Sequence, residues 1–102
     1  MSLDYNVFYM ENPVKGIAWM HEGNIPDLII SDYFMPEMNG HEFLTYLKSS
    51  EIFKNIPIIV LSSIENSAER IKLLEEGAND FIVKPFNPQE LKIRVRNILR
   101  RY

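Results

Sequence analysis

Three polar residues in this chain could together carry out phosphoryl chemistry. Asp32, Ser62 and Lys84 each stand at the end of a short run rich in Ile, Leu, Val or Phe. A carboxylate can attack phosphorus and hold the phosphoryl group as an acyl phosphate. A hydroxyl donor and a lysine are among the groups that neutralise the oxygens of a transferring phosphoryl group. If the three side chains meet, the expected chemistry is phosphoryl transfer to the carboxylate.

The apolar runs predict the strands that bring these side chains together. Each run is too short for a helix of its own, and such runs are typical of strands buried on both faces of a parallel sheet. The predicted strands are Asn6–Met10, Leu28–Ser31, Pro57–Ser63 and Asp80–Pro85. Ligands of open α/β sheets bind outside the carboxyl ends of the strands. The carboxylate, the hydroxyl and the ammonium are therefore expected to line one crevice.

Helix signals separate the predicted strands. Asn12 before Pro13 and Asn87 before Pro88 are typical helix starts, with an N-cap followed by proline at the first position. The other two helices are predicted from Gly40 to Ser49 and from a capping box at 66–69 to about Gly77. Strands that alternate with helices predict a parallel sheet covered by helices on both faces. We expect a single domain over residues 1–102.

Composition narrows the function classes. The 102 residues carry a net charge of −3, so electrostatics gives no reason to expect nucleic acid as a direct partner. The absence of cysteine excludes disulfides and thiol catalysis. No apolar run approaches the roughly 20 residues of a membrane span, so we expect a cytoplasmic protein with no membrane partner.

The same residues resemble a known family. The segment Asp32–Gly40 reads Asp-Tyr-Phe-Met-Pro-x-Met-x-Gly, Ser62 follows thirty positions after Asp32, and Lys84 precedes Pro-Phe. These motifs are similar to those of the receiver domain of two-component response regulators. The resemblance implies a flavodoxin-like doubly wound sheet with strand order 2-1-3-4-5. It implies a phosphoacceptor signalling domain, not an enzyme, with self-dephosphorylation as its only possible catalysis.

The resemblance assigns a role to each site residue. Asp32 would accept the phosphoryl group from a sensor histidine kinase or phosphotransfer protein and would bind Mg²⁺, together with the backbone carbonyl of Phe34. Ser62 would hydrogen-bond the phosphoryl oxygens, and Lys84, joined to Pro85 by a cis peptide bond, would pair with them. Phe81 stands at the switch position, where an aromatic ring turns inward on phosphorylation. That movement would alter the surface formed by the last strand and its two flanking helices, and so an output domain or target protein.

One departure from the family concerns the N-terminal side of the site. Receivers carry two acidic residues at the end of a first strand, about 45 positions before the phosphoacceptor, but only 31 residues precede Asp32. The strand Asn6–Met10 matches the family's second strand, so the first strand and first helix are predicted to be missing. About four strands and four helices remain. Without the acidic pair Mg²⁺ is expected to bind poorly.

The missing strand also predicts a structural cost. It would lie between Asn6–Met10 and Leu28–Ser31, and a parallel strand without its neighbour exposes unpaired amides and carbonyls. We therefore expect either direct pairing of the remaining strands or completion of the sheet by a second copy in a homodimer. The missing helix would have covered part of the last helix, so Leu91, Val95 and Ile98 are expected to be exposed.

Two alternative functions stay open from the sequence. The first is a pseudo-receiver, an interaction module of the same fold that works without phosphate, which the missing acidic pair would favour. The second is a phosphohydrolase of the haloacid dehalogenase type, which also places Asp, Ser or Thr, and Lys at strand ends. Such an enzyme needs an acid two residues after the nucleophile to protonate the leaving group. Phe34 stands there, so this alternative is the weaker one.

Overall fold

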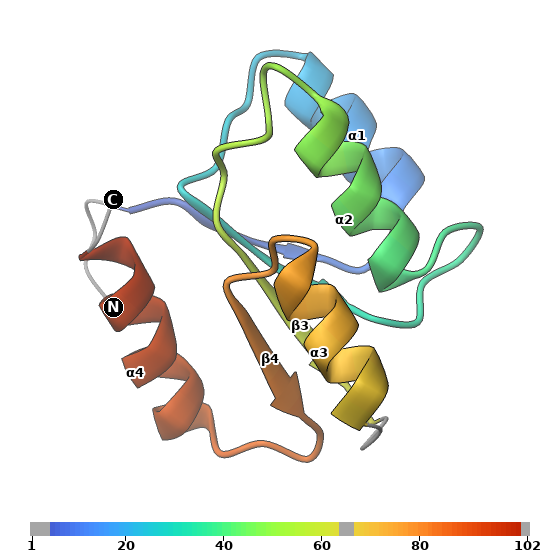
Figure 1. The fold of residues 1–102 in the computed structure, drawn as a ribbon. Helices are drawn as coiled ribbons and strands as arrows, with labels where there is room; N and C mark the ends of the chain where they lie inside the picture. The colour runs from blue at the N-terminus through green and yellow to red at the C-terminus, as the bar shows by residue number, and fades with distance from the viewer. Residues whose placement is uncertain (1–4, 64–66, 101–102) are drawn as a thin grey trace.

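The computed structural model describes residues 5–63 and 67–100, which alternate strand and helix throughout (Figure 1). The strands are β1 (Val7–Met10), β2 (Leu28–Asp32), β3 (Ile58–Ser62) and β4 (Asp80–Val83). The helices are α1 (Pro13–His21), α2 (Gly40–Ser49), α3 (Ser67–Glu75) and α4 (Pro88–Leu99). The predicted alternation is confirmed. The predicted cap of α3 at Asn66 lies outside the described residues.

The four described strands form one parallel sheet in the order β1-β2-β3-β4. β1 pairs directly with β2, with Tyr9 opposite Ile30 and Met10 opposite Ser31. β2 pairs in turn with β3, so that Asp32 lies opposite Leu61. If the family order 2-1-3-4-5 is written without strand 1, it reads 2-3-4-5, which is the order β1-β2-β3-β4 seen here. Of the two expected ways to satisfy the strand next to the gap, the structure shows direct pairing within the chain.

Local sequence explains where the helices begin. The side chain of Asn12 accepts a hydrogen bond from the Lys15 amide at 3.2 Å, and Pro13 occupies the first turn of α1. At α2, Asn39 accepts from the Glu42 amide at 2.8 Å while the Glu42 carboxylate accepts from the Asn39 amide at 3.0 Å. These reciprocal bonds satisfy amides that the helix itself leaves without partners. They place the start of α2 directly after the loop that follows Asp32.

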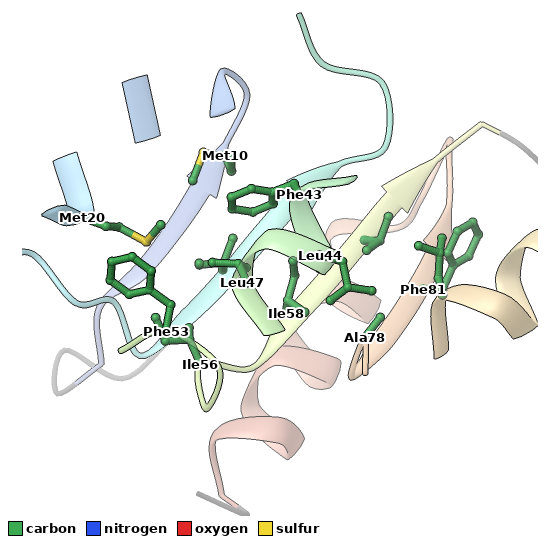
Figure 2. Packing of buried hydrophobic residues seen from close by; sticks show 13 residues of the cluster. Met10, Met20, Phe43, Leu44, Leu47, Phe53, Ile56, Ile58, Ala78 and Phe81 are labelled. Atoms are coloured by element: carbon green, nitrogen blue, oxygen red, sulfur yellow. The ribbon is translucent and has the colours of Figure 1, made fainter. Parts of the chain in front are cut away.

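One face of the sheet, which we call the three-helix face, packs against α1, α2 and α3 (Figures 1 and 2). Its centre is formed by Phe43, Leu44 and Leu47 of α2, none of which is exposed to solvent. Around them lie buried residues from the strands, the other helices and the loops, including Met10, Met20, Phe53, Ile58 and Phe81. Burial of this many apolar side chains is the main source of stability for a domain of this size.

The opposite face, which we call the α4 face, is covered by α4 alone among the described helices (Figure 1). Val95 is 2% exposed and Ile98 is 7% exposed, and they pack on strand residues such as Ile59 and Leu61. The expectation that these two residues would be exposed is therefore wrong, because the closed sheet still offers α4 an apolar surface.

The opening left on the α4 face lies beside α4 and not beneath it. Leu91, the third residue expected to be exposed, is half-buried at the edge of α4. There a hollow of about 230 Å³ is lined by Tyr9, Ile30, Leu61, Phe86 and Leu91. This hollow therefore lies at one border of the α4 face.

Candidate functional site

Asp32 and Lys84 form an ion pair at the carboxyl edge of the sheet. The Lys84 Nζ atom lies 2.6 Å from Asp32 Oδ1, and the Asp32 side chain is 18% exposed, so the carboxylate is sheltered but reachable. Asp32 is the last residue of β2, and Lys84 directly follows β4. The two strands are separated by β3, so the long lysine side chain has to reach across the end of that strand. The predicted meeting of carboxylate and ammonium is present.

The loop after Asp32 is held close to the end of the sheet. The Tyr33 amide donates to the Leu61 carbonyl at 2.8 Å, and the Gly40 amide donates to the Tyr33 carbonyl at 2.5 Å. A Cβ atom at Gly40 would lie 2.9 Å from the Tyr33 Cα, a backbone atom that cannot move independently. Glycine is therefore required where the start of α2 passes the residue next to Asp32.

Tyr9 is a site residue that the sequence analysis missed. Its hydroxyl donates to Asp32 Oδ2 at 2.7 Å, so each carboxylate oxygen of Asp32 has a partner. Burial, followed by the hydrogen bond to Asp32 and its negative charge, raises the pKa of Tyr9 to about 12. The direct pairing of β1 with β2 is what brings Tyr9 to the site. It puts Tyr9 opposite Ile30, on the side of the sheet that Asp32 shares two residues later.

Ser62 ends β3 and is 2% exposed, between the strands that carry Asp32 and Lys84. Its carbonyl accepts a hydrogen bond from the Lys84 amide at 2.8 Å, which ties the end of β3 to the residue after β4. The peptide bond between Lys84 and Pro85 is cis. The three predicted strand-end residues therefore lie at one edge, where the side chains of Asp32 and Lys84 form the ion pair.

Two aromatic residues assigned by the resemblance lie in different environments. The side chain of Phe34, in the loop after β2, is 65% exposed. Phe81 is 7% exposed and belongs to the core of the three-helix face, where it lies opposite Val60 of β3 (Figure 2). The ring of Phe81 is thus already packed inward in this structure.

A further contact ties the site loop to α3. The Tyr33 hydroxyl donates to Glu69 Oε1 at 2.9 Å, which joins the loop after β2 to α3. Burial raises the pKa of Tyr33, and the hydrogen bond to Glu69 adds to the effect. The residue that follows Asp32 is therefore linked to one of the helices that flank β4.

The comparison with protein families identifies the family to which the fold described above belongs. The chain matches the family described as "Response regulator receiver domain" over residues 2–96. The chain belongs to this family. A receiver domain is a signalling domain and not an enzyme of the usual kind, and this one keeps the family's fold with four described strands.

Some curated relatives of this receiver domain are longer signalling proteins. Histidine kinase P4 of Formosa agariphila is 38% identical over 96 residues, which cover 94% of this chain and 7% of that kinase. The phosphate regulon transcriptional regulatory protein PhoB of Escherichia coli is 38% identical over 76 residues, which cover 74% of this chain and 33% of that regulator. The receiver domain thus spans a third or less of the length of these relatives.

Solved structures agree with the fold. The signal receiver domain of a signal transduction histidine kinase from Syntrophus aciditrophicus has a TM-score of 0.81 at 27% identity, over 93% of this chain and 89% of that one. A response regulator from Desulfuromonas acetoxidans has a TM-score of 0.81 at 23% identity, over 94% and 97% of the two chains. In the part of the receiver domain that the structure describes, no helix has the length and apolarity to cross a membrane.

Receiver domains generally bind Mg²⁺, but the residues at this edge do not fit that ion. Among the described residues, no three His, Cys, Asp or Glu side chains come close enough together to hold a metal. Both oxygens of Asp32 are engaged by Lys84 and Tyr9. Mg²⁺ requires near-octahedral oxygen ligation, usually from carboxylates and water. A single engaged carboxylate and the carbonyl of Phe34 are a poor donor set for it.

Proposed function

We propose that this receiver domain works in a two-component phosphorelay, in which Asp32 accepts a phosphoryl group from a histidine kinase or a phosphotransfer protein. The observation that carries the proposal is the 2.6 Å contact between Lys84 Nζ and Asp32 Oδ1 at the carboxyl edge of the sheet. An ammonium in this place is already positioned to offset the negative charge of a phosphoryl group that arrives at the carboxylate.

The phosphoryl transfer involves two groups, the Asp32 carboxylate and the phosphorylated imidazole of the donor. An oxygen of Asp32 forms a bond to phosphorus while the bond from phosphorus to the donor's imidazole nitrogen breaks. The electron pair of the broken bond stays with the donor's imidazole, and the carboxylate becomes a neutral acyl group that bears the charged phosphoryl. Lys84 would then pair with the phosphoryl oxygens, and the hydroxyl of Ser62 would donate to one of them.

We propose Phe81 as the residue that passes the change on to a partner. Phe81 lies opposite Val60 of β3, and Val60 stands two residues before Ser62. Phe81 is also on β4, the strand that leads to Lys84. A phosphoryl group that draws Ser62 and Lys84 together would change the packing around this ring, and with it the surface of α3, β4 and α4. An output domain or target protein would recognise that surface. The location we propose is the cytoplasm, where such kinases present their phosphohistidine.

The proposal is tested by intact mass spectrometry after incubation with acetyl phosphate, with and without Mg²⁺. We expect one added phosphoryl group on the wild-type chain and none on Asp32→Asn. Asp27→Asn is the matched control, since Asp27 is an exposed carboxylate just before the other end of β2, where it accepts a hydrogen bond from the Asn6 amide at 2.6 Å. Transfer from the phosphohistidine of a purified kinase is the corresponding test of the partner.

Two results would overturn the proposal. Equal labelling of the wild type and Asp32→Asn would place the phosphoryl group on another residue. The absence of labelling in the wild type and in Tyr9→Phe, with either donor, would favour the pseudo-receiver instead. The comparisons give no support to that alternative or to the phosphohydrolase over the main proposal.

A further inference from the structure

The phosphoacceptor position of this chain has a neighbour that the family motif does not include. The Tyr9 hydroxyl donates to Asp32 Oδ2 at 2.7 Å, while Lys84 Nζ contacts Oδ1 at 2.6 Å. Each oxygen of the carboxylate thus has a partner: a neutral hydroxyl donor on β1 contacts one, and an ammonium after β4 contacts the other. Hydrogen bonds to an ionised acceptor are roughly twice as strong as those between neutral groups. The hydrogen bond from Tyr9 therefore stabilises the charged form of the Asp32 carboxylate.

The contact depends on the sheet that this chain forms. Since β1 pairs directly with β2, Tyr9 lies opposite Ile30, and Asp32 stands two residues further along the same side of β2. A diagonal neighbour of this kind is within reach of an aromatic side chain. The ring also lines the hollow together with Leu61, Phe86 and Leu91. A strand between β1 and β2 would separate the two residues by a further strand spacing, about 4.8 Å.

We propose that Tyr9 is a regulatory residue of the phosphoacceptor site: its hydroxyl stabilises the unphosphorylated carboxylate of Asp32, and so opposes phosphorylation and hastens loss of the phosphoryl group. This inference rests on the proposed function, because it concerns the lifetime of the phosphoryl group on Asp32. The direction follows from charge. The full charge on the carboxylate, which makes the hydrogen bond strong, disappears from these two oxygens when the acyl phosphate forms.

The hydrolysis step shows how the hydroxyl acts. Water forms the new bond to phosphorus, the bond between phosphorus and the Asp32 oxygen breaks, and its electron pair returns to the carboxylate. Inorganic phosphate leaves with the oxygen and protons of the water. Negative charge develops on the carboxylate in the transition state, and a donor already aimed at that oxygen stabilises it. When Asp32 attacks a donor, the carboxylate loses negative charge in the transition state. The same hydrogen bond therefore slows phosphorylation.

Tyr9→Phe tests the inference with little change in packing, because it keeps the ring against the hollow and removes only the hydroxyl. Tyr46→Phe is the matched control, since the Tyr46 hydroxyl makes a 2.7 Å hydrogen bond to His21 Nε2, between α2 and α1. The measurement is the fraction of chain labelled by acetyl phosphate and the decay of the label after the donor is removed, by intact mass. A charge-assisted hydrogen bond predicts a label that is lost about tenfold more slowly in Tyr9→Phe. Tyr46→Phe should match the wild type.

The outcomes separate this inference from the proposed function. Slower loss in Tyr9→Phe, or labelling of Tyr9→Phe when the wild type takes no label, supports the role of Tyr9. Equal decay in the wild type and Tyr9→Phe overturns that role and leaves Asp32 as the acceptor. Faster decay in Tyr9→Phe also overturns it, because the hydroxyl would then stabilise the phosphorylated form. The absence of label in both chains removes the proposed function, and this inference with it.

Discussion

The two faces of the sheet differ in how completely they are covered. The three-helix face has side chains from α1, α2 and α3 around a centre of unexposed residues such as Phe43 and Leu47. The α4 face depends on α4 alone among the described helices, and its border next to β1 holds the hollow beside Tyr9. Tyr9 is 44% exposed, although it lies on a strand of the same sheet. One face of the domain is closed and the other is open next to the site.

The difference shows which side of this four-stranded sheet is less well covered among the described residues. When β1 and β2 close the gap between them, the backbone groups pair and the three-helix face keeps its core. The α4 face is less completely covered, and its hollow is lined by Tyr9, whose hydroxyl contacts Asp32. The direct pairing of β1 with β2 also lets the Tyr9 hydroxyl reach Asp32. Stability and site chemistry are therefore linked at this border.

The largest expected effect concerns the covered face. Phe43→Ala should lower the free energy of unfolding by about 3–5 kcal/mol, because it removes a fully buried ring from a packed core and leaves a cavity. Leu91→Ala, at the border of the hollow, removes a half-buried side chain and should cost only about 1 kcal/mol. Chemical denaturation of both variants and the wild type measures the two values.

The relative size of the two losses decides this prediction. If Leu91→Ala destabilises the domain as much as Phe43→Ala, the α4 face is as tightly packed as the three-helix face. The hollow would then be closed in solution, and the contrast between the faces would fail. The slope of free energy against denaturant should be equal in the three proteins, which is the check that both variants unfold from the same compact state.

A smaller effect is expected at the ion pairs that fasten the single helix α4. Arg94 donates from Nη1 to both carboxylate oxygens of Asp80, at 3.0 and 2.8 Å, and from Nη2 to Glu90 Oε1 at 2.8 Å. These bonds raise the pKa of Arg94 and tie α4 to the start of β4. Since the arginine is 39% exposed, Arg94→Ala should cost about 1 kcal/mol at low salt and less at high salt.

Arg96→Ala is the control for this prediction, because Arg96 is exposed on the same helix and its substitution has a similar effect on helix propensity. The two variants should differ at low ionic strength and converge as salt is added. Equal stability of Arg94→Ala and Arg96→Ala at low salt would mean that α4 is held by its apolar residues alone.

The sequence predicted the parts of this fold that depend on local pattern. Apolar runs located the strands, asparagine caps located the starts of α1 and α4, and strand-end residues located the edge where Asp32 and Lys84 meet. These features depend on a few neighbouring residues and on a general property of parallel sheets. They did not require knowledge of which strands pair.

The features that the sequence analysis got wrong or missed all depend on strand pairing. Val95 and Ile98 were expected to be exposed, but the closed sheet buries them. Tyr9 was not assigned to the site, because its distance from Asp32 is set by the register of β1 on β2. A family pattern places residues in the family's sheet, so it misplaces contacts where this chain brings together strands that the family keeps apart.

The smallest expected effect sharpens the contrast at Tyr9 itself. Its pKa is raised from 10.0 to about 12 in the folded chain, so folding favours the neutral phenol. The stability from this preference is fully present below pH 10 and is lost as the pH rises to about 12. Because the side chain is 44% exposed, solvent screening reduces the effect, and we expect the advantage of the wild type over Tyr9→Phe to shrink by about 0.5 kcal/mol.

Denaturant unfolding of both proteins at pH 8, 10 and 11.5 measures this change. Other groups titrate in both proteins and cancel in the difference. A difference that stays constant across these pH values would mean that the phenol is open to water and makes no lasting bond to Asp32.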